Sequence, residues 1–191
     1  LTIPAVSTQE TTGRVYPSGE AAAHLTGYIG KITDEEIKEH KDYPYKESDF
    51  IGKRGLEQLY EKQLRGEPGA KIIIEKEMDG ETEEIVLAEK PVKHGEHIQV
   101  NIDVNIQERV FEAFENHPGN AAVIHPKTGE ILALVSSPSF DPNEFVYGIT
   151  QSRWDQLMKD EDEPFVNRFA ATYAPGSVMK LVSAAIGLNT G

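Results

Sequence analysis

The sequence predicts an α+β fold in which short helices accompany antiparallel strands. The first sign is a hairpin: two apolar-rich runs, residues 70–77 and 83–90, flank Asp79-Gly80, a pair suited to a tight turn. The second is the order of the second half, in which a strand-like run, a helix, two strand-like runs, a loop and a helix follow one another. The third is the length, since 191 residues can bury a core as one ordinary domain or two small ones.

Helical signals precede the hairpin in the first half. Thr33 followed by Glu36 fits a capping box and predicts a short helix through about His40. Residues 55–64 carry apolar side chains at helical spacing, which predicts one amphipathic helix that ends before Gly66. The first half is therefore expected to be a mixed unit of helices and strands.

The second half has a different pattern. Residues 98–102 alternate as a strand does, and Asp103 can then cap a helix. Residues 121–125 and 130–137 predict two further strands, joined by a turn. This order predicts an antiparallel sheet with helices packed beside it.

Two helices are expected after a loop at residues 137–143. The first lies around Trp154 to Met158. The second runs from Ser177 to Leu188 and is apolar and rich in small residues, which predicts a buried helix.

The composition excludes several classes of protein. Nineteen Lys and Arg stand against 32 Asp and Glu, a net charge of −13, so no general phosphate-binding surface and no nucleic-acid partner are expected. The absence of cysteine excludes disulfides and thiolate metal sites. The chain has no apolar run of about 18 residues, and its first ten residues lack the features of a signal peptide. An acidic, soluble, globular piece is expected, although a missing anchor can equally reflect where the sequence was cut.

Ser177 and Lys180 are the candidate catalytic residues. They stand three apart, directly after a Pro-Gly pair, so both side chains would project from one face at the start of a helix. A serine hydroxyl becomes a good nucleophile when a base takes its proton, and a lysine in a dry cleft can serve as that base. The helix start adds free N–H groups that favour a developing oxyanion. A single S-x-x-K pattern is weak by itself, and a helix-capping serine beside a surface lysine is the alternative.

Other candidate sites are disfavoured. His94 and His97 lie close in sequence but lack a third metal ligand nearby, so no metal site is expected. His125 is expected to be a packed residue. The pairs Gly27/Gly30 and Gly52/Gly55 lack the context of a phosphate loop and are expected to be turn glycines, which admit positive φ.

Taken together, the motifs of the chain resemble those of the class B penicillin-binding proteins. The first half resembles their non-catalytic pedestal, or dimerisation domain, and the second half the opening of their transpeptidase domain. The stretches that carry the resemblance are Tyr16-Pro17, residues 24–30 (HLTGYIG), 51–57 (IGKRGLE), 64–66 (LRG), 101–103 with Gln107, 126–133 (PKTGEILA), 138–143 (PSFDPN) and 175–180 (PGSVMK). Within the family, the chain looks closest to the low-affinity, methicillin-resistance type of Gram-positive bacteria.

The resemblance implies a domain division and a reaction. Residues 1–95 would be the pedestal and residues 96–191 the truncated start of the transpeptidase domain. Ser177 would attack the penultimate D-Ala carbonyl of a peptidoglycan stem peptide, with Lys180 as the base, and the acyl-enzyme would pass to an amine of a neighbouring strand. β-Lactams would acylate the same serine, other cell-wall synthesis proteins are possible partners, and no metal or organic cofactor is implied. The parent would work at the extracytoplasmic face of the cell membrane, with its anchor absent from this chain.

The chain departs from the family pattern in two places. Val178-Met179 replaces the frequent Thr-Phe between the serine and the lysine, which should leave both in register. No S-x-N or K-[ST]-G follows Ser177, so the chain alone is expected to be inactive. Lys127-Thr128-Gly129 precedes the serine instead of following it and is expected to be a hairpin turn.

Two other functions are compatible with the residues. The first half can be an interaction platform for cell-wall proteins with the second half as its scaffold. The chain can also belong to a β-lactam sensor, although sensors of that kind lack the pedestal that residues 14–66 resemble.

Overall fold

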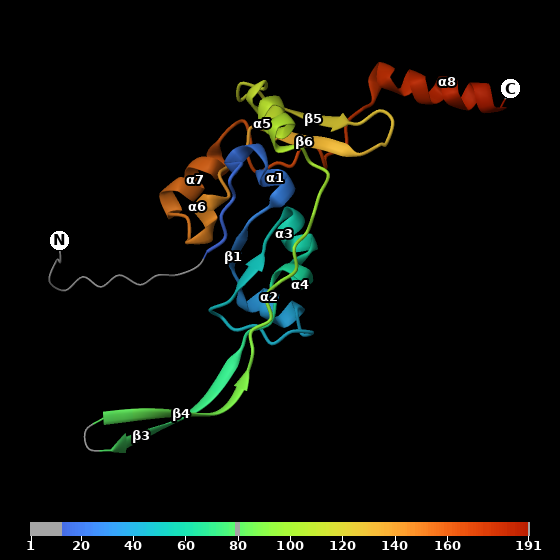
Figure 1. The fold of residues 1–191 in the computed structure, drawn as a ribbon. Coiled ribbons are helices and arrows are strands. Elements are labelled where there is room, and N and C mark those ends of the chain that lie inside the picture. The colour runs from blue at the N-terminus through green and yellow to red at the C-terminus, as the bar shows by residue number, and fades with distance from the viewer. Residues whose placement is uncertain (1–12, 79–80, 191) are drawn as a thin grey trace.

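The computed structural model of the chain describes residues 13–78 and 81–190. Figure 1 shows a central body of short helices and strands, a long hairpin that projects from one end, and a helix that extends from the other. In chain order the elements are η1 (Gly19–Ala21), α1 (Ala23–Thr26), β1 (Ile29–Lys31), α2 (Asp34–Glu39), β2 (Phe50–Gly52), α3 (Gly55–Leu59), α4 (Glu61–Leu64), β3 (Ala70–Met78), β4 (Glu81–Lys90), α5 (Val104–Glu112), β5 (Gly119–Ile124), β6 (Ile131–Ser137), α6 (Asn143–Val146), α7 (Gln151–Lys159), η2 (Gly176–Val178) and α8 (Met179–Thr190).

The strands of the described residues form three separate antiparallel pairs, β1–β2, β3–β4 and β5–β6. Helices accompany the first and third pairs, which confirms the α+β prediction. In the second half, α5 packs against β6, as expected for a helix that follows an extended segment and precedes a hairpin.

Capping decides where two of the predicted helices begin. The Thr33 side chain accepts a hydrogen bond from the Glu36 amide, and the Glu36 carboxylate accepts one from the Thr33 amide, so the predicted capping box opens α2. Asp103 accepts hydrogen bonds from the Asn105 and Ile106 amides and opens α5, as predicted.

The predicted helix over 55–64 is divided into α3 and α4 at Tyr60, whose φ of −110° and ψ of 23° lie outside the helical region. The Glu61 side chain provides a physical reason, because it turns away from the helix. Its carboxylate accepts hydrogen bonds from the Gly52 amide at 2.7 Å and from the Tyr45 hydroxyl at 3.0 Å. The break lets one carboxylate join α4 to the end of β2.

The four glycines predicted to lie in turns divide into two groups. Gly27 (φ 73°) and Gly55 (φ 59°) have positive φ, as predicted. Gly30 and Gly52 lie inside β1 and β2, so the prediction was wrong for them. At Gly52, a Cβ would overlap the Glu57 backbone, so close approach of α3 requires that glycine.

Gly27 and Gly55 also bring two helix ends into backbone contact. A Cβ on Gly27 would overlap the Arg54 carbonyl, and one on Gly55 would come within 2.6 Å of the Leu25 carbonyl oxygen. The C-terminal end of α1 therefore lies directly on the N-terminal end of α3, with no room for a side chain between them.

The first predicted hairpin is confirmed as β3 and β4, which pair from Ala70↔Lys90 to Met78↔Glu81. Its expected turn at Asp79-Gly80 lies outside the described residues. The second hairpin, β5–β6, is also confirmed. Its turn carries Gly129 at a φ of 76°, so Lys127-Thr128-Gly129 is a hairpin turn, as predicted.

Residues 98–102 do not form a strand, so that prediction was wrong. The apolar side chains at alternate positions, Ile98, Val100 and Ile102, line a pocket instead of facing a sheet. The segment meets the β5–β6 hairpin through the Asp103 amide, which donates to the Leu132 carbonyl at 2.8 Å.

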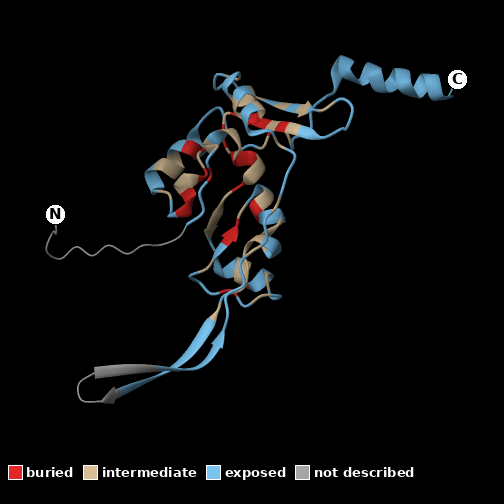
Figure 2. Cartoon of the chain, in the orientation of Figure 1, coloured by how far each residue is buried: buried red, intermediate tan, exposed pale blue. Residues whose placement is uncertain are grey.

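The region expected to be helical around Trp154 to Met158 is α7. The region from Ser177 to Leu188 is also helical, in η2 and α8, but it is exposed along its whole length, so the predicted burial was wrong (Figure 2). Its apolar side chains find no covering element in the described part of the chain, and Leu181 and Leu188 are 77% and 90% exposed. No helix among residues 13–78 and 81–190 is long and apolar enough to span a bilayer.

The main core joins residues from both ends of the chain. Its buried members are Ala23, Phe140, Phe145 and Leu157. The partly buried side chains that pack against them are Tyr28, Ile149, Trp154 and Phe165. Ring centroids lie 4.4 Å apart for Tyr28 and Phe145 and 5.0 Å apart for Phe140 and Phe165. A smaller cluster of Ile32, Tyr45 and Ile51 fills the space around β1 and β2.

His24 is part of this aromatic region and is buried with a polar partner. Its Nε2 lies 2.9 Å from the Pro164 carbonyl oxygen, and its ring meets Phe140 edge to face at 5.3 Å. Because a carbonyl only accepts, Nε2 donates in this contact. Burial lowers the pKa of His24 from 6.5 to about 4, so the ring is neutral at neutral pH.

Replacing Gly27 by alanine is expected to destabilise the protein by about 3 kcal/mol or more, because positive φ and backbone overlap act together. Gly129→Ala is the matched control, since its φ of 76° is similar but no atom lies within 4 Å of its added Cβ. It should cost only about 1–2 kcal/mol. Urea unfolding measures both, and equal losses would contradict the close packing of α1 on α3.

The neutral, buried His24 predicts that stability decreases on mild acidification. Between pH 6.5 and about 4 the unfolded chain holds more protons than the folded one, so the free energy of unfolding falls as the pH is lowered. The loss should total about 3 kcal/mol and level off below the folded pKa. His24→Gln should flatten this dependence in urea titrations at several pH values, and His94→Gln, at an exposed position, should not. Identical slopes in all three proteins would refute the assignment.

Candidate active site

Ser177 lies where a short loop leads into the helix at the C-terminal end of the described chain. Gly176 has a φ of 53°, in the left-handed region, and turns the chain into η2, which runs directly into α8. The Val178 amide, next to the serine, donates to the Pro175 carbonyl at 3.2 Å, within the first turn of η2. Ser177 therefore lies at the start of a helix, as expected, and its role as a nucleophile stays a prediction.

Lys180 lies one turn further on, in the first turn of α8. Residues three apart are neighbours on a helix surface, so the two side chains share one face of the helix start. Both residues are exposed, and no hydrogen bond joins their side chains in the described part of the chain. Figure 1 shows α8 extending away from the central body. In the described part of the chain the two residues are therefore not enclosed in the water-excluding cleft that a neutral lysine requires.

The predicted turn motif at residues 125–130 lies on a different element from Ser177. His125 accepts a hydrogen bond at Nδ1 from the Thr128 amide at 3.2 Å, and its own amide donates to the Glu130 carbonyl at 2.8 Å. His125 therefore organises the turn between β5 and β6. Among residues 13–78 and 81–190, no cluster of three metal-ligating side chains occurs, around His94 and His97 or elsewhere.

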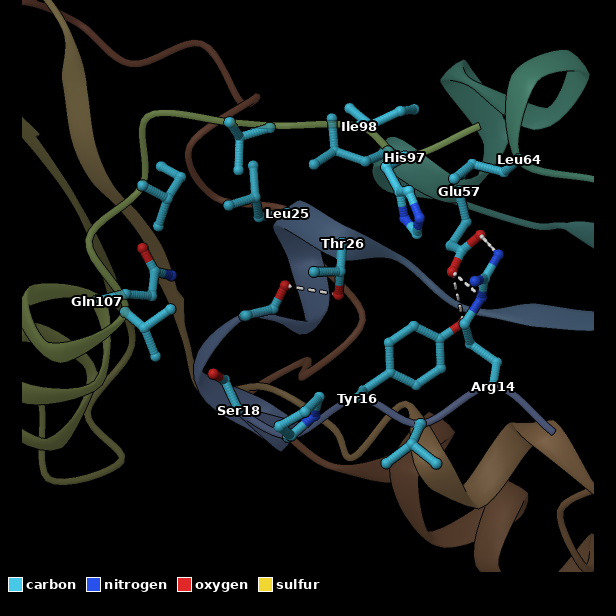
Figure 3. Close-up of a pocket in the computed structure, with 18 of the residues that line it drawn as sticks. Arg14, Tyr16, Ser18, Leu25, Thr26, Glu57, Leu64, His97, Ile98 and Gln107 are labelled. Atoms are coloured by element: carbon cyan, nitrogen blue, oxygen red, sulfur yellow. Dashed lines mark hydrogen bonds and ion pairs between the residues drawn. The ribbon is translucent and has the colours of Figure 1, made fainter. Parts of the chain in front are cut away.

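A pocket of about 540 Å³ lies where the N-terminal segment, α3, and the stretch from Gly95 to Gln107 meet (Figure 3). One wall is apolar and includes Leu25, Leu56 and Ile98. Polar side chains stand at two ends of the pocket and tie together segments that are far apart in sequence. We call this region the junction, defined by Arg14, Tyr16, Glu57, Gln107 and Asn143.

At one end of the junction, a buried carboxylate holds the N-terminal segment. Arg14 Nε lies 2.8 Å from Glu57 Oε1, and Arg14 Nη2 donates to Oε2 at 3.2 Å. The Tyr16 hydroxyl donates to Glu57 Oε1 at 3.2 Å and accepts from the Ile29 amide at 2.9 Å. Burial raises the pKa of the Glu57 carboxyl, and the Arg14 guanidinium opposes that rise. Burial also raises the pKa of Tyr16, which keeps its hydroxyl protonated as the donor.

At the other end, Gln107 joins three parts of the chain. Its side-chain nitrogen donates to the Ala21 carbonyl at 2.6 Å and to the Leu134 carbonyl at 2.9 Å, and its side-chain oxygen accepts from the Leu134 amide at 2.8 Å. The residue is 1% exposed. One buried amide thus fixes α5 to β6 and both to the segment before α1.

Asn143 completes the junction through the backbone of Tyr16. Its side chain accepts from the Tyr16 amide at 2.9 Å and donates to the Tyr16 carbonyl at 3.0 Å, so it pairs with this backbone as a neighbouring strand would. Asp141 orients the amide by accepting from Asn143 Nδ2 at 2.7 Å. This contact joins residues 127 positions apart.

The sequence alone does not reveal the junction as a structural unit. Its members carry no catalytic pattern, and only the resemblance marked them, since Tyr16, Glu57, Gln107 and Asn143 all lie in the matching stretches. A buried glutamine and a buried asparagine that serve backbone groups have no spacing rule that would reveal them from one sequence.

Two domain families match the chain, one in each half. The family described as the penicillin-binding protein dimerisation domain matches residues 1–100, and the penicillin-binding protein transpeptidase domain matches residues 119–191. Penicillin-binding protein 3 of Bacillus subtilis is 43% identical over 97% of this chain, and the peptidoglycan D,D-transpeptidase MrdA of Acinetobacter baumannii is 37% identical over 98%. The chain spans 27% and 28% of the lengths of these two relatives.

Solved structures show the same architecture. A penicillin-binding protein, PBP2, from Helicobacter pylori in complex with MreC superposes with a TM-score of 0.75 at 34% identity, over 88% of this chain and 31% of that one. PBP2 of Pseudomonas aeruginosa in complex with WCK 5153 gives a TM-score of 0.76 at 34% identity, over 94% of this chain and 36% of that one.

These similarities establish the family of the chain but not its subtype within that family. The names of these relatives do not include the methicillin-resistance type, so that placement stays a prediction. The dimerisation domain alone matches more than half of the residues, and the transpeptidase domain follows it in the same order as the predicted halves. The chain therefore belongs to the class B penicillin-binding proteins, with a dimerisation domain followed by the start of a transpeptidase domain.

Proposed function

We propose that the whole protein is a serine D,D-transpeptidase that cross-links peptidoglycan, with Ser177 as its nucleophile. The observation that supports this most is the position of Ser177, at the start of an apolar helix and inside the stretch that matches the transpeptidase domain. The substrate is a stem peptide that ends in D-Ala-D-Ala. We also propose that residues 1–95 are the pedestal and residues 96–191 the opening of the catalytic domain.

The reaction proceeds by two acyl transfers. Ser177 Oγ attacks the carbonyl of the penultimate D-Ala while neutral Lys180 takes the hydroxyl proton. The peptide bond breaks, the terminal D-Ala leaves as an amine that receives a proton, and an ester to Ser177 remains. An amine of a neighbouring strand then attacks the ester, forms the cross-linking amide, and releases Ser177 with its proton restored. The Ser177 amide would donate one of two hydrogen bonds to the oxyanion.

Because α8 is exposed in this chain, the rest of the catalytic domain would have to enclose Ser177 and Lys180. A lysine accepts a proton only in its neutral form, which a water-excluding site favours. In the whole protein, further parts of the transpeptidase domain would cover the apolar side chains of α8 and enclose Ser177 and Lys180. The short share of the relatives' length that the chain spans is consistent with this.

The proposed catalytic site and the family also suggest inhibitors and a partner for the whole protein. A β-lactam would acylate Ser177 as a substrate mimic, and acylation would be slow if the protein belongs to the low-affinity, methicillin-resistance type. The H. pylori relative was solved in complex with MreC, which supports a further cell-wall protein as a partner of this one. The whole protein would act at the extracytoplasmic face of the cell membrane. No metal or organic cofactor takes part in this chemistry.

Incubation of this chain with a fluorescent penicillin is expected to give no covalent adduct. Ser177 is exposed on a helix that no other described element covers, so the activated pair and the full oxyanion hole are missing. Intact-mass spectrometry and peptide mapping measure the outcome. A stable adduct on Ser177 of this chain would contradict the proposed need for the remaining domain.

The full-length protein provides the positive control. It should be labelled, and Ser177→Ala should abolish labelling. Ser183→Ala is the matched control, because Ser183 lies on the same helix and its hydroxyl only donates to the Met179 carbonyl at 3.0 Å. Lys180→Met should slow acylation by at least about a hundredfold, as expected for loss of a general base. Persistent labelling of the Ser177→Ala protein would refute the assignment.

A further inference from the structure

A short segment ahead of Ser177 is held through its backbone carbonyls. Residues 162–166, which we call the connector, lie between α7 and the loop that leads to Ser177, and they form no helix or strand. All five of their carbonyl oxygens accept hydrogen bonds from side chains. Side chains thus supply the hydrogen bonds that a neighbouring strand would supply in a sheet.

Two of the donor residues belong to the second half of the chain. Arg168 donates from Nη2 to the Asp162 carbonyl at 2.6 Å and from Nη1 to the Glu163 carbonyl at 3.1 Å. Ser136, on β6, donates from Oγ to the Val166 carbonyl at 3.1 Å and accepts from the Arg168 amide at 3.1 Å. Both donor residues are buried, so this side of the connector is fixed to the β5–β6 hairpin.

The other two donor residues belong to the half that matches the dimerisation domain. His24, on α1, donates from Nε2 to the Pro164 carbonyl at 2.9 Å, across 140 positions. Arg54 donates from Nη1 to the Phe165 carbonyl at 2.9 Å, across 111 positions. The Arg54 guanidinium also lies 5.7 Å from the centre of the Phe165 ring, within the range of a cation–π contact. Two consecutive carbonyls of the connector are therefore held from the first half.

The packing of α1 on α3 sets the spacing of these two donors. His24 is a buried residue of α1, and Arg54 is the N-cap of α3. The end of α1 lies directly on the start of α3, since no side chain fits at Gly27 or Gly55. Closely packed elements do not shift independently, so the two donors are presented to the connector together.

The connector lies at the last point where the chain is tied to the body before Ser177. Within the described residues, the Arg168 amide makes the last hydrogen bond to the body ahead of the serine, and residues 171–174 make none. The connector thus sets the point from which the chain runs to Ser177.

We propose that His24 and Arg54 are positioning residues for the acylation of Ser177. They act through the Pro164 and Phe165 carbonyls, which fix the start of the path to the nucleophile, and not on the substrate itself. A misplacement of about 1 Å in an active site can cost about a hundredfold in rate, so a small shift of this path has a measurable effect. The inference rests on the function proposed above for Ser177.

The role of Arg54 is tested by acylation of the full-length protein with a fluorescent penicillin. Arg54→Met keeps the apolar stem of an exposed side chain and removes the donor. The acylation rate constant at saturating penicillin should fall about fivefold, the order expected for the net loss of one hydrogen bond. The dissociation constant of the complex before acylation should stay unchanged, because the contact with the ligand is not altered.

Arg65→Met is the matched control in the first half. Arg65 donates from Nη1 to the Tyr45 hydroxyl at 2.9 Å and lies 3.6 Å from the centre of the Tyr43 ring, and within the described chain it makes no hydrogen bond to the second half. This variant should lower the melting temperature and leave the acylation rate constant unchanged. Equal rate constants in Arg54→Met and Arg65→Met would overturn the proposal, whether both are unchanged or both are lower.

His24 is tested by two variants that differ in their ability to donate. His24→Gln keeps an N–H group near the place of Nε2, whereas His24→Leu has none. Among the molecules that the penicillin labels, acylation should be slower for His24→Leu than for His24→Gln, and equal rates would overturn the role of this hydrogen bond. If His24→Leu yields no folded protein, the comparison of Arg54→Met with Arg65→Met decides.

Ser177→Ala separates this inference from the proposed function. Persistent labelling of that variant would refute the role of Ser177 and the positioning role with it. Labelling that requires Ser177 but proceeds at the same rate in Arg54→Met would refute the positioning role alone.

Discussion

The buried side chain of Gln107 is the interaction on which the arrangement of the chain depends. Its side-chain amide makes three hydrogen bonds to the backbone, one to Ala21 and one to each polar group of Leu134, and the residue is 1% exposed. A buried backbone group left without a partner costs about 1–3 kcal/mol, so removal of this side chain would leave several such groups unsatisfied at once. The segment before α1, α5 and β6 are therefore held in one arrangement.

The dimerisation domain and the opening of the transpeptidase domain meet through this junction as one folded body. Glu57 holds Arg14 and Tyr16, and Asn143 pairs with the backbone of Tyr16 from the other half of the chain. The elements outside this body, the β3–β4 hairpin and α8, are the exposed ones. The β3–β4 hairpin and the helix that follows Ser177 thus project from opposite ends of the central body.

Local signals in the sequence predicted the elements but not their packing. The capping box at Thr33, the cap at Asp103 and both hairpins were predictable because each depends on residues that are close in sequence. The strand at 98–102 was predicted wrongly, because alternation that lines a pocket resembles alternation on a sheet. The helix at 177–188 was predicted correctly but not its exposure, because composition records that a helix is apolar and not what covers it. The spacing of Ser177 and Lys180 and the family resemblance were enough to single out that pair. The junction depends on contacts between residues up to 127 positions apart in sequence, which no local pattern can reveal.

Native-state hydrogen exchange tests most directly whether the two halves form one cooperative unit. The amide of Thr26, which donates to the Ala22 carbonyl in the first half, and the amide of Leu134, which donates to Gln107 in the second, should open with the same free energy. Amides of α8 should exchange much faster. Equal protection of Thr26 and Leu134 is the expected result, and opening free energies that differ by more than about 1 kcal/mol would show two independent units and contradict the account.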